Sequence, residues 1–237
     1  MENLADALAW LSDGANWSGP GGIPTRVWEH LVLSVVPVVI ALAVALPVGV
    51  VLGHLRKGGL VAVNISNVGR AIPSFAVLVL ALQALGFGRT PAYVALVALA
   101  VPPILTNAYV GIAGVDDDMV ESARGMGMRG LDVLRRVELP LAVPLVMAGV
   151  RTSAVQVVAT ATLGAYIAQG GLGRFIVDGY AQRDFGQVVG GAILVAALAV
   201  VTEVGLGALQ RATVPRGLAV DPGRARELDV APGAGAR

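Results

Sequence analysis

The sequence predicts an all-α membrane protein with about five transmembrane helices. Apolar residues make up 56% of the 237 positions and charged residues only 14%, whereas a soluble domain carries about 25% charged residues. Several stretches without Asp, Glu, Lys or Arg approach the roughly 20 residues that a helix needs to cross a bilayer. They lack the apolar–polar alternation of barrel strands. Because lipid offers the backbone no hydrogen-bond partners, these stretches are expected to be helical.

The five expected spans occupy residues 31–53, 71–88, 90–115, 152–173 and 185–202, and the last of these could extend to residue 209. Residues 1–27 are expected to form an extracellular tail or an interfacial helix around positions 4–11. Residues 28–212 form the expected transmembrane domain. Residues 213–237 are rich in Pro, Gly and Ala and are expected to be a disordered cytoplasmic tail.

The distribution of Lys and Arg predicts the orientation, because cytoplasmic loops carry an excess of both. With five spans, eleven basic residues fall on the side that holds residues 116–140 and the C-terminus, and four fall on the other side. Arg70 and Arg151 lie at the edges of spans and are left out of this count. We therefore expect the N-terminus outside and the C-terminus in the cytoplasm, in a multi-pass protein of the cell membrane surrounded by lipid.

The sequence predicts no catalytic chemistry. Cysteine is absent, which excludes thiol catalysis and cysteine metal sites, and the two histidines, His30 and His54, are too few for a histidine-rich metal centre. There is no phosphate-binding loop of the G-x-x-x-x-G-K-[ST] type and no nucleophile–base–acid constellation. We expect no catalytic residue, no metal and no cofactor. The net charge of +1 argues against a nucleic-acid partner.

The loop at residues 116–140 is the most informative segment, because it is longer than a simple connection requires. Three aspartates at 116–118 can cap a helix, and Glu121 follows Asp118 at the spacing of a capping box. An apolar stripe at Met119, Val120, Ala123 and Met126 has helical spacing. Gly127 and Gly130 should then end this helix, and a second helix can begin at Leu131. From these residues alone, a docking knob and a solvated loop remain equally open.

The loop also contains a spaced motif: Glu121-Ser122-Ala123, three residues, Gly127, nine residues, Val137, Glu138 and Leu139-Pro140. It resembles the signature of permease subunits of binding-protein-dependent ABC importers, which is Glu-Ala-Ala, three residues, Gly, nine residues, Ile, any residue and Leu-Pro. The spacing is complete, and the departures are Ser122 for Ala and Val137 for Ile.

The resemblance implies a type I ABC importer fold of the methionine-permease kind, in which this loop is the coupling helix that docks into the ATP-binding subunit. By resemblance, Glu121, Ala123 and Gly127 make that contact, and Leu139 and Pro140 lead the chain back to the membrane. The implied partners are two copies of an ATP-binding subunit, which would hydrolyse the ATP, a second copy of this permease or a homologous one, and an extracellular substrate-binding protein.

Three further stretches, at residues 71–74, 124–128 and 164–173, are similar to permeases for glycine betaine, carnitine, choline and related osmoprotectants. The implied cargo is a small osmoprotectant of the glycine betaine, choline, carnitine or proline type. An importer for another small solute, such as an amino acid like methionine, is the alternative. An ion-driven carrier is a second alternative, disfavoured by the missing inverted repeat and the unexplained loop.

Several polar residues in the spans are candidates for lining a pathway, although helix–helix hydrogen bonding would explain them equally well. They are Ser74, Asn107, Gln156, Thr160 and Tyr166. Arg151 and Glu203 could form an ion pair, or snorkel at the cytoplasmic interface with Arg151 at the start of the fourth span. The aromatic residues Phe75, Tyr93, Tyr109 and Tyr166 are available for cation–π contact with a quaternary ammonium.

Two G-x-x-x-G pairs, Gly49/Gly53 and Gly186/Gly190, have the spacing of a close helix–helix contact between two copies, although such pairs also arise by chance in a chain with 31 glycines. The predicted extracellular segment 169–187 carries Arg174, Asp178, Arg183 and Asp184 and is a candidate for contact with the binding protein.

Overall fold

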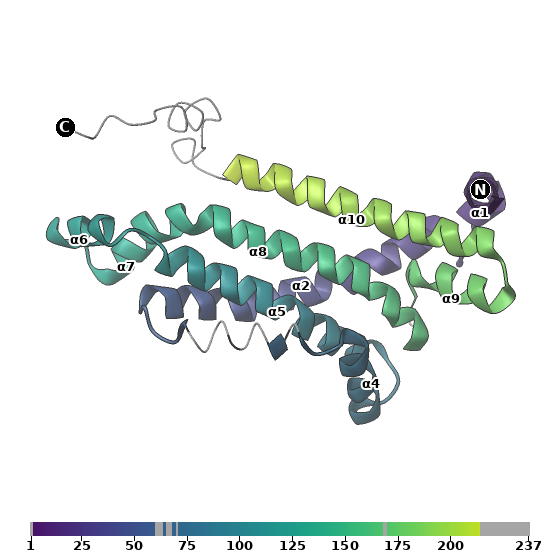
Figure 1. Cartoon of the computed structure of the whole chain (residues 1–237), viewed down its shortest axis with the longest axis horizontal. Coiled ribbons are helices and arrows are strands. Elements are labelled where there is room, and N and C mark those ends of the chain that lie inside the picture. The colour runs from purple at the N-terminus through teal and green to yellow at the C-terminus, as the bar shows by residue number, and fades with distance from the viewer. Residues whose placement is uncertain (1, 60–63, 65–67, 70, 168–169, 214–237) are drawn as a thin grey trace, which may run out of the picture.

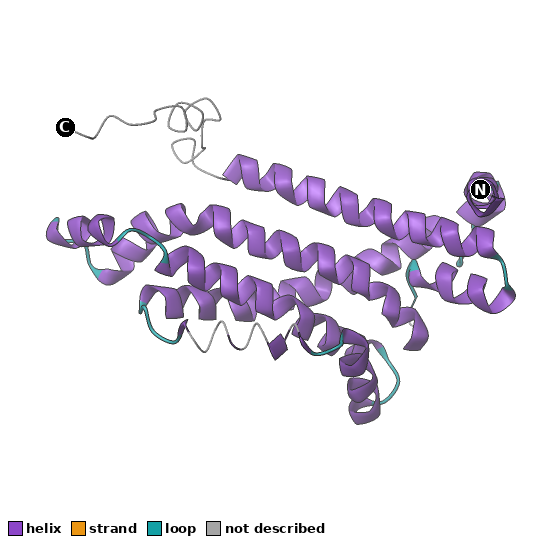
Figure 2. Cartoon of the chain, viewed as in Figure 1, coloured by secondary structure: helices purple, strands orange, loops and turns teal. Residues whose placement is uncertain are grey.

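The computed structural model describes residues 2–59, 64, 68–69, 71–167 and 170–213, and its regular elements there are all helical (Figure 2). The expected disordered tail lies, except for Thr213, outside the described residues. The elements in chain order are α1 (Glu2–Ser12), η1 (Gly14–Trp17), α2 (Ile23–His54), α4 (Ser74–Leu85), α5 (Arg89–Ala113), α6 (Asp117–Gly125), α7 (Gly130–Val133), η2 (Leu134–Glu138), α8 (Leu139–Thr160), η3 (Ala161–Ile167), α9 (Gly173–Gln182) and α10 (Phe185–Thr213).

Four helical segments of the described chain are long and apolar enough to cross a membrane: Ile23–His54, Arg89–Ala113, Gly130–Ile167 and Phe185–Thr213. The remaining expected span, at 71–88, is shorter than predicted. Its helix α4 has 12 residues, which corresponds to about 18 Å and is less than the roughly 30 Å of a hydrocarbon core. Gly86 and Gly88, both at positive φ, follow α4 and precede α5.

Helix α2 begins at Ile23, eight residues before the expected span at 31–53 and inside the segment expected to be a tail. Pro24 stands in its first turn, where a missing N–H costs nothing. The charged residues that hid this beginning, Arg26 and Glu29, pair with each other at 2.9 Å. The expected domain boundary between residues 27 and 28 therefore lies inside α2.

The fourth membrane segment also differs from the prediction, which placed it at residues 152–173. The helix runs without a break from Gly130 through η2 and α8 and ends as the 3-10 helix η3 at Ile167. The stretch η2, just before Pro140, is a π-helix, which is wider than an α-helix. Pro140 has no backbone N–H to donate, so the missing helical hydrogen bond falls directly after the widened turn. Arg151 consequently lies in the middle of α8, about 18 Å along the helix from Leu139, and not at the start of a span.

Four long helices, α2, α5, α8 and α10, run along the longest axis of the molecule (Figure 1). Helices α6 and α7 lie at one end and α1 and α9 at the other (Figure 1). The main apolar core lies between α2, α5, α4 and α8 and is formed by small and branched residues such as Ala41, Ala100 and Val157. A second cluster joins α1, α9 and α10, where the rings of Trp10 and Phe175 meet edge to face at 5.0 Å.

The two G-x-x-x-G pairs pack helices of the same chain. A Cβ atom on Gly49 would lie 2.7 Å from Ala108 Cβ, and one on Gly53 would lie 2.7 Å from Ile112 Cβ, so both glycines let α2 approach α5. A Cβ atom on Gly190 would meet the Trp10 ring of α1 at 2.6 Å. The hypothesis that these pairs serve an interface between two copies is replaced by intramolecular packing.

Candidate functional site

Helix α6 starts with an aspartate cap and is charged in accordance with its dipole. Asp116 is the N-cap, and its side chain accepts a 2.8 Å hydrogen bond from the Asp118 N–H. Asp117 and Asp118 occupy the first turn and Arg124 the last. Because the cap is Asp116, Glu121 does not occupy the capping-box position, so the expected Asp118–Glu121 pairing is wrong.

Gly127 ends α6 through the positive φ of 84° that the sequence pattern requires of it. The Gly127 N–H donates to Arg124 O at 2.9 Å and the Met128 N–H donates to Ala123 O at 3.2 Å. These two bonds form a Schellman motif, in which a left-handed residue satisfies the last helical carbonyls. The sharp reversal that follows directs the chain into α7.

The two faces of α6 have different environments. Val120 and Ala123 are buried at 5% and 2% exposure and pack with Val115 and Val133 of the same chain. The side chain of Ala123 therefore packs inside the loop, and the implied contact of this residue with the ATP-binding subunit stays a prediction. Exposed residues form the outer face of the loop: Glu121, Ser122, Met119, Met126 and Leu131.

The end of the loop leads directly into the membrane segment. Leu139 and Pro140 are half-buried and form the first turn of α8, so the chain returns to the membrane as a continuous helix. Sequence reasoning missed two contacts that fasten this loop to the end of α2. His54 Nδ1 lies 2.5 Å from Glu138 Oε2, and Arg56 lies 2.5 Å from Asp117 Oδ1. The sequence offered one indication of these contacts: His54 and Arg56 follow the first predicted span on the side of the membrane that also holds residues 116–140.

Three of the pathway candidates gather beside α4. Ser74 and Thr160 line the same small pocket between α4, α5 and the end of α8. Tyr166 is exposed, and its ring meets that of Phe75 edge to face at 6.0 Å. Gln156 is exposed on α8 one turn before Thr160, and therefore on the same face.

Asn107 stands apart from this group. Its amide donates to the Pro103 carbonyl of its own helix at 2.8 Å. Gly149 of α8 packs against it, since a Cβ atom at that glycine would lie 2.6 Å from Asn107 Cβ. Helix packing accounts for this side chain.

Arg151 and Glu203 meet between α8 and α10. Arg151 Nε lies 3.1 Å from Glu203 Oε1, and the side chains are 35% and 47% exposed. Arg151 also donates to the Gln210 side-chain oxygen at 3.2 Å, and Gln210 donates to the Pro144 carbonyl at 3.0 Å. These contacts form a polar chain that joins α8 and α10.

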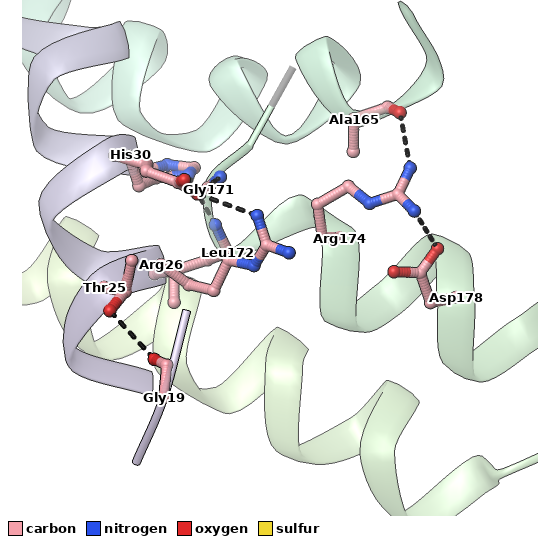
Figure 3. A network of polar contacts seen from close by, with 10 residues as sticks. Gly19, Thr25, Arg26, His30, Ala165, Gly171, Leu172, Arg174 and Asp178 are labelled. Atoms are coloured by element: carbon pink, nitrogen blue, oxygen red, sulfur yellow. Dashed lines mark hydrogen bonds and ion pairs between the residues drawn. The ribbon is translucent and has the colours of Figure 1, made fainter. Parts of the chain in front are cut away.

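At the opposite end of the molecule, a polar network surrounds residues 170–174 (Figure 3). The Gly171 N–H donates to Glu29 Oε2 at 2.8 Å, and the Leu172 N–H donates to His30 Nδ1 at 3.3 Å. Arg174 bridges the Ala165 carbonyl and the Asp178 carboxylate, the latter at 2.6 Å (Figure 3). This network holds residues 171 and 172 and the start of α9 next to α2 and η3.

Apolar helices long enough to cross a membrane, together with a capped polar loop at one end, are the features of an integral membrane protein. The chain belongs to the family of binding-protein-dependent transport system inner membrane components, whose sequence profile matches residues 45–216. It is therefore a transport subunit of an ABC importer, and ATP hydrolysis resides in a partner subunit. Membership implies an ATP-binding subunit and a substrate-binding protein as partners.

Curated relatives extend over most of the chain. A glycine betaine/carnitine/choline transport system permease, OpuCB of Bacillus subtilis, is 39% identical over 198 residues, which are 84% of this chain and 91% of the relative. A carnitine transport permease, OpuCB of Listeria monocytogenes, is 40% identical over 193 residues, 81% of this chain and 88% of the relative.

The fold matches that of a solved importer. An inward-facing structure of the MetNI methionine ABC transporter aligns with a TM-score of 0.70 and 24% identity, covering 80% of this chain and 95% of the solved one. This likeness confirms the predicted type I importer architecture.

Proposed function

We propose that this permease forms the translocation pathway for a small osmoprotectant of the glycine betaine, choline, carnitine or proline type, which an extracellular binding protein delivers. The carrying observation is the identity of 39% over 84% of the chain to a permease named for glycine betaine, carnitine and choline. The methionine alternative has only a likeness of fold behind it. The osmoprotectant assignment therefore has the stronger support.

The outer face of the loop, on α6 and the start of α7, is the proposed docking surface for the ATP-binding subunit. Met119, Met126 and Leu131 expose large apolar side chains at 51%, 73% and 56% on a polar, membrane-distal loop. Such side chains on a short capped helix fit an apolar cleft of a partner. Glu121, Ser122 and Gly127 lie on the same exposed surface and complete it.

The working importer contains two ATP-binding subunits and two permeases, which are two copies of this chain or this chain with a homologue. The N-terminus of this chain lies outside the cell and its C-terminus lies in the cytoplasm.

ATP binding moves the docked loops, and the permeases alternate between inward-open and outward-open states. The receptor and ATP drive this switch through their different affinities for the two states. Ser74, Thr160, Gln156 and Tyr166 line the pathway beside α4.

Uptake by the reconstituted importer tests the proposed cargo. The complex of this permease, its ATP-binding subunit and its binding protein is placed in liposomes with ATP inside, and uptake of radiolabelled glycine betaine, choline, carnitine, proline and methionine is compared. ATP-dependent uptake of at least one osmoprotectant is expected. Uptake of methionine alone would overturn the assignment, and uptake by the permease alone without ATP would indicate an ion-driven carrier.

A further inference from the structure

Helix α2 contacts functional loops at both ends of the membrane domain. Its 32 residues correspond to about 48 Å of helix. Figure 1 shows it running from the end that holds α1 and α9 to the end that holds α6 and α7. One helix therefore lies within side-chain reach of the proposed docking loop and of residues 170–172 at the outer end.

At the cytoplasmic end, α2 and the residues just after it are fastened to both ends of the docking loop. Glu138, at the end of the loop, is 1% exposed and pairs with His54 at 2.5 Å. Arg56 donates to the Val115 carbonyl at 2.8 Å and pairs with Asp117 at 2.5 Å, both at the start of the loop. A buried carboxylate requires its partner, so the His54–Glu138 contact resists separation.

At the outer end, His30 joins three segments at one point. Its Nδ1 accepts from the Leu172 N–H, so the proton belongs on Nε2, which donates to the Val158 carbonyl of α8 at 2.9 Å. The residue is fully buried. Together with the Glu29 bond to the Gly171 N–H, this contact ties α2 to the outer segment.

Between its two ends, α2 is stiffened by contact with α5 and not by its own hydrogen bonds alone. Pro37 and Pro47 interrupt its backbone ladder. Gly49 and Gly53 bring its backbone against α5, with no space for a side chain. A displacement at His54 is therefore passed along a packed pair of helices, because close-packed interiors transmit strain.

We propose that α2 is a connecting rod, which carries movement of the docking loop through His54 and Glu138 to residues 170–172 through Glu29 and His30. This role rests on the proposed docking of the loop. Movement of the loop would then reach the outer end by two routes, one through α2 and one through the continuous helix of α7, η2 and α8. His54, Arg56 and Glu138 are positioning residues, which act on the outer segment only through α2.

A fluorescent reporter at the outer end measures this transmission without any transported solute. Because the chain has no cysteine, Tyr180→Cys provides one labelling site, on the exposed side of α9. The permease is labelled with bimane, assembled with its ATP-binding subunit in nanodiscs, and compared without nucleotide and after trapping with ATP and vanadate. The background chain should show a change in emission on trapping.

His54→Ala and Glu138→Ala in this background should remove most of the emission change, because the contact that carries the movement from the loop to α2 is lost. Trapped nucleotide and co-purification of the ATP-binding subunit should stay unchanged, which a general structural defect would not allow. Glu138→Gln should retain most of the change, since it preserves the length and hydrogen bonding of the side chain. Lys57→Ala, an exposed neighbour, is the matched control and should behave as the background chain.

The proposed role of α2 would be refuted if His54→Ala and Glu138→Ala kept the full emission change. It would also be refuted if trapping caused no emission change in the background chain. If these variants fail to assemble, the exchanged pair His54→Glu with Glu138→His decides: a restored change supports the rod, and an assembled complex without the change refutes it. Failure of the docking itself would appear separately, as loss of the ATP-binding subunit during purification. Failure of the proposed cargo would appear only in the uptake assay.

Discussion

Gly127 illustrates how one residue decides the shape of the loop at residues 116–140. It lies at a φ of 84°, and the space around it is open, since a Cβ atom there would meet no atom within 4 Å. Its requirement for glycine is therefore one of backbone conformation and not of crowding. Gly125, two positions earlier, also has open space but lies in the helix.

Gly127→Ala should destabilise the Schellman turn by about 1–2 kcal/mol, the cost of a left-handed conformation for an L-residue. Gly125→Ala should be neutral or stabilising by about 0.5–1 kcal/mol, because alanine favours a helix. Co-purification of the ATP-binding subunit and ATP-dependent uptake would be measured for both variants. Equal behaviour of the two would contradict a conformational role for Gly127.

The Arg151–Glu203 pair allows a second prediction for single residues. Arg151→Met leaves Glu203 without its arginine partner in a membrane helix, which should cost up to about 3 kcal/mol. Glu203→Met should cost less, because Arg151 keeps the Gln210 side chain at 3.2 Å. The double variant should recover most of the loss, since an apolar pair can replace an ion pair.

Thermal unfolding in detergent, followed for the wild-type chain and the three variants, measures this cycle. Additive losses in the double variant would show that the two side chains do not depend on each other.

Among the elements, the packing of α2 on α5 depends on Gly49 and Gly53. Their G-x-x-x-G motif had suggested a contact between two copies of the chain. The motif indicates only that a close approach occurs, and the partner helix proved to be in the same chain. Gly205, on α10, has no atom within 4 Å of a Cβ at its position. It therefore offers a matched comparison within another membrane helix.

Gly53→Ala should lower the stability of the isolated permease by about 1–3 kcal/mol, because its Cβ would overlap Ile112 and the Tyr109 carbonyl. Gly205→Ala should cause no loss. The melting temperature of each variant, measured on the purified chain in detergent, separates these outcomes. An interface between two copies would instead leave the melting temperature of the single chain unchanged and weaken only the association.

For the whole molecule, the central prediction concerns which loops face the cytoplasm. The absence of cysteine makes single-cysteine labelling clean. Ser122→Cys lies on exposed α6, and Arg183→Cys lies at the opposite end, between α9 and α10. Arg183 has a positive φ of 60°, so its side chain stands at a tight, exposed turn.

A membrane-impermeant maleimide applied to intact cells should label Arg183→Cys and leave Ser122→Cys unlabelled until the membrane is permeabilised. The physical reason is the excess of Lys and Arg on the side of residue 122, which retains that side in the cytoplasm. The reverse pattern would remove the docking loop from any ATP-binding subunit and would refute the proposed mechanism.

The membrane class, the helical class and the turn in the loop at residues 116–140 were predictable from the sequence alone. Long apolar stretches identify membrane helices because lipid and backbone hydrogen bonding act on each segment separately. The loop motif was equally readable, since Asp116, Gly127 and Pro140 act on the backbone next to them. Gly127 kept its predicted role as a turn, whereas the capping partner within α6 was assigned wrongly.

Tertiary structure decided which faces meet, and those contacts join residues that are distant in the sequence. Glu138 finds His54 across 84 positions, Ala123 turns inward onto Val133, and Gly53 packs on α5. Composition cannot reveal such pairs, because an apolar membrane helix carries little polar–apolar periodicity to indicate its buried side. Hydrophobicity placed the segments in the membrane, and steric fit between helices determined how they are joined.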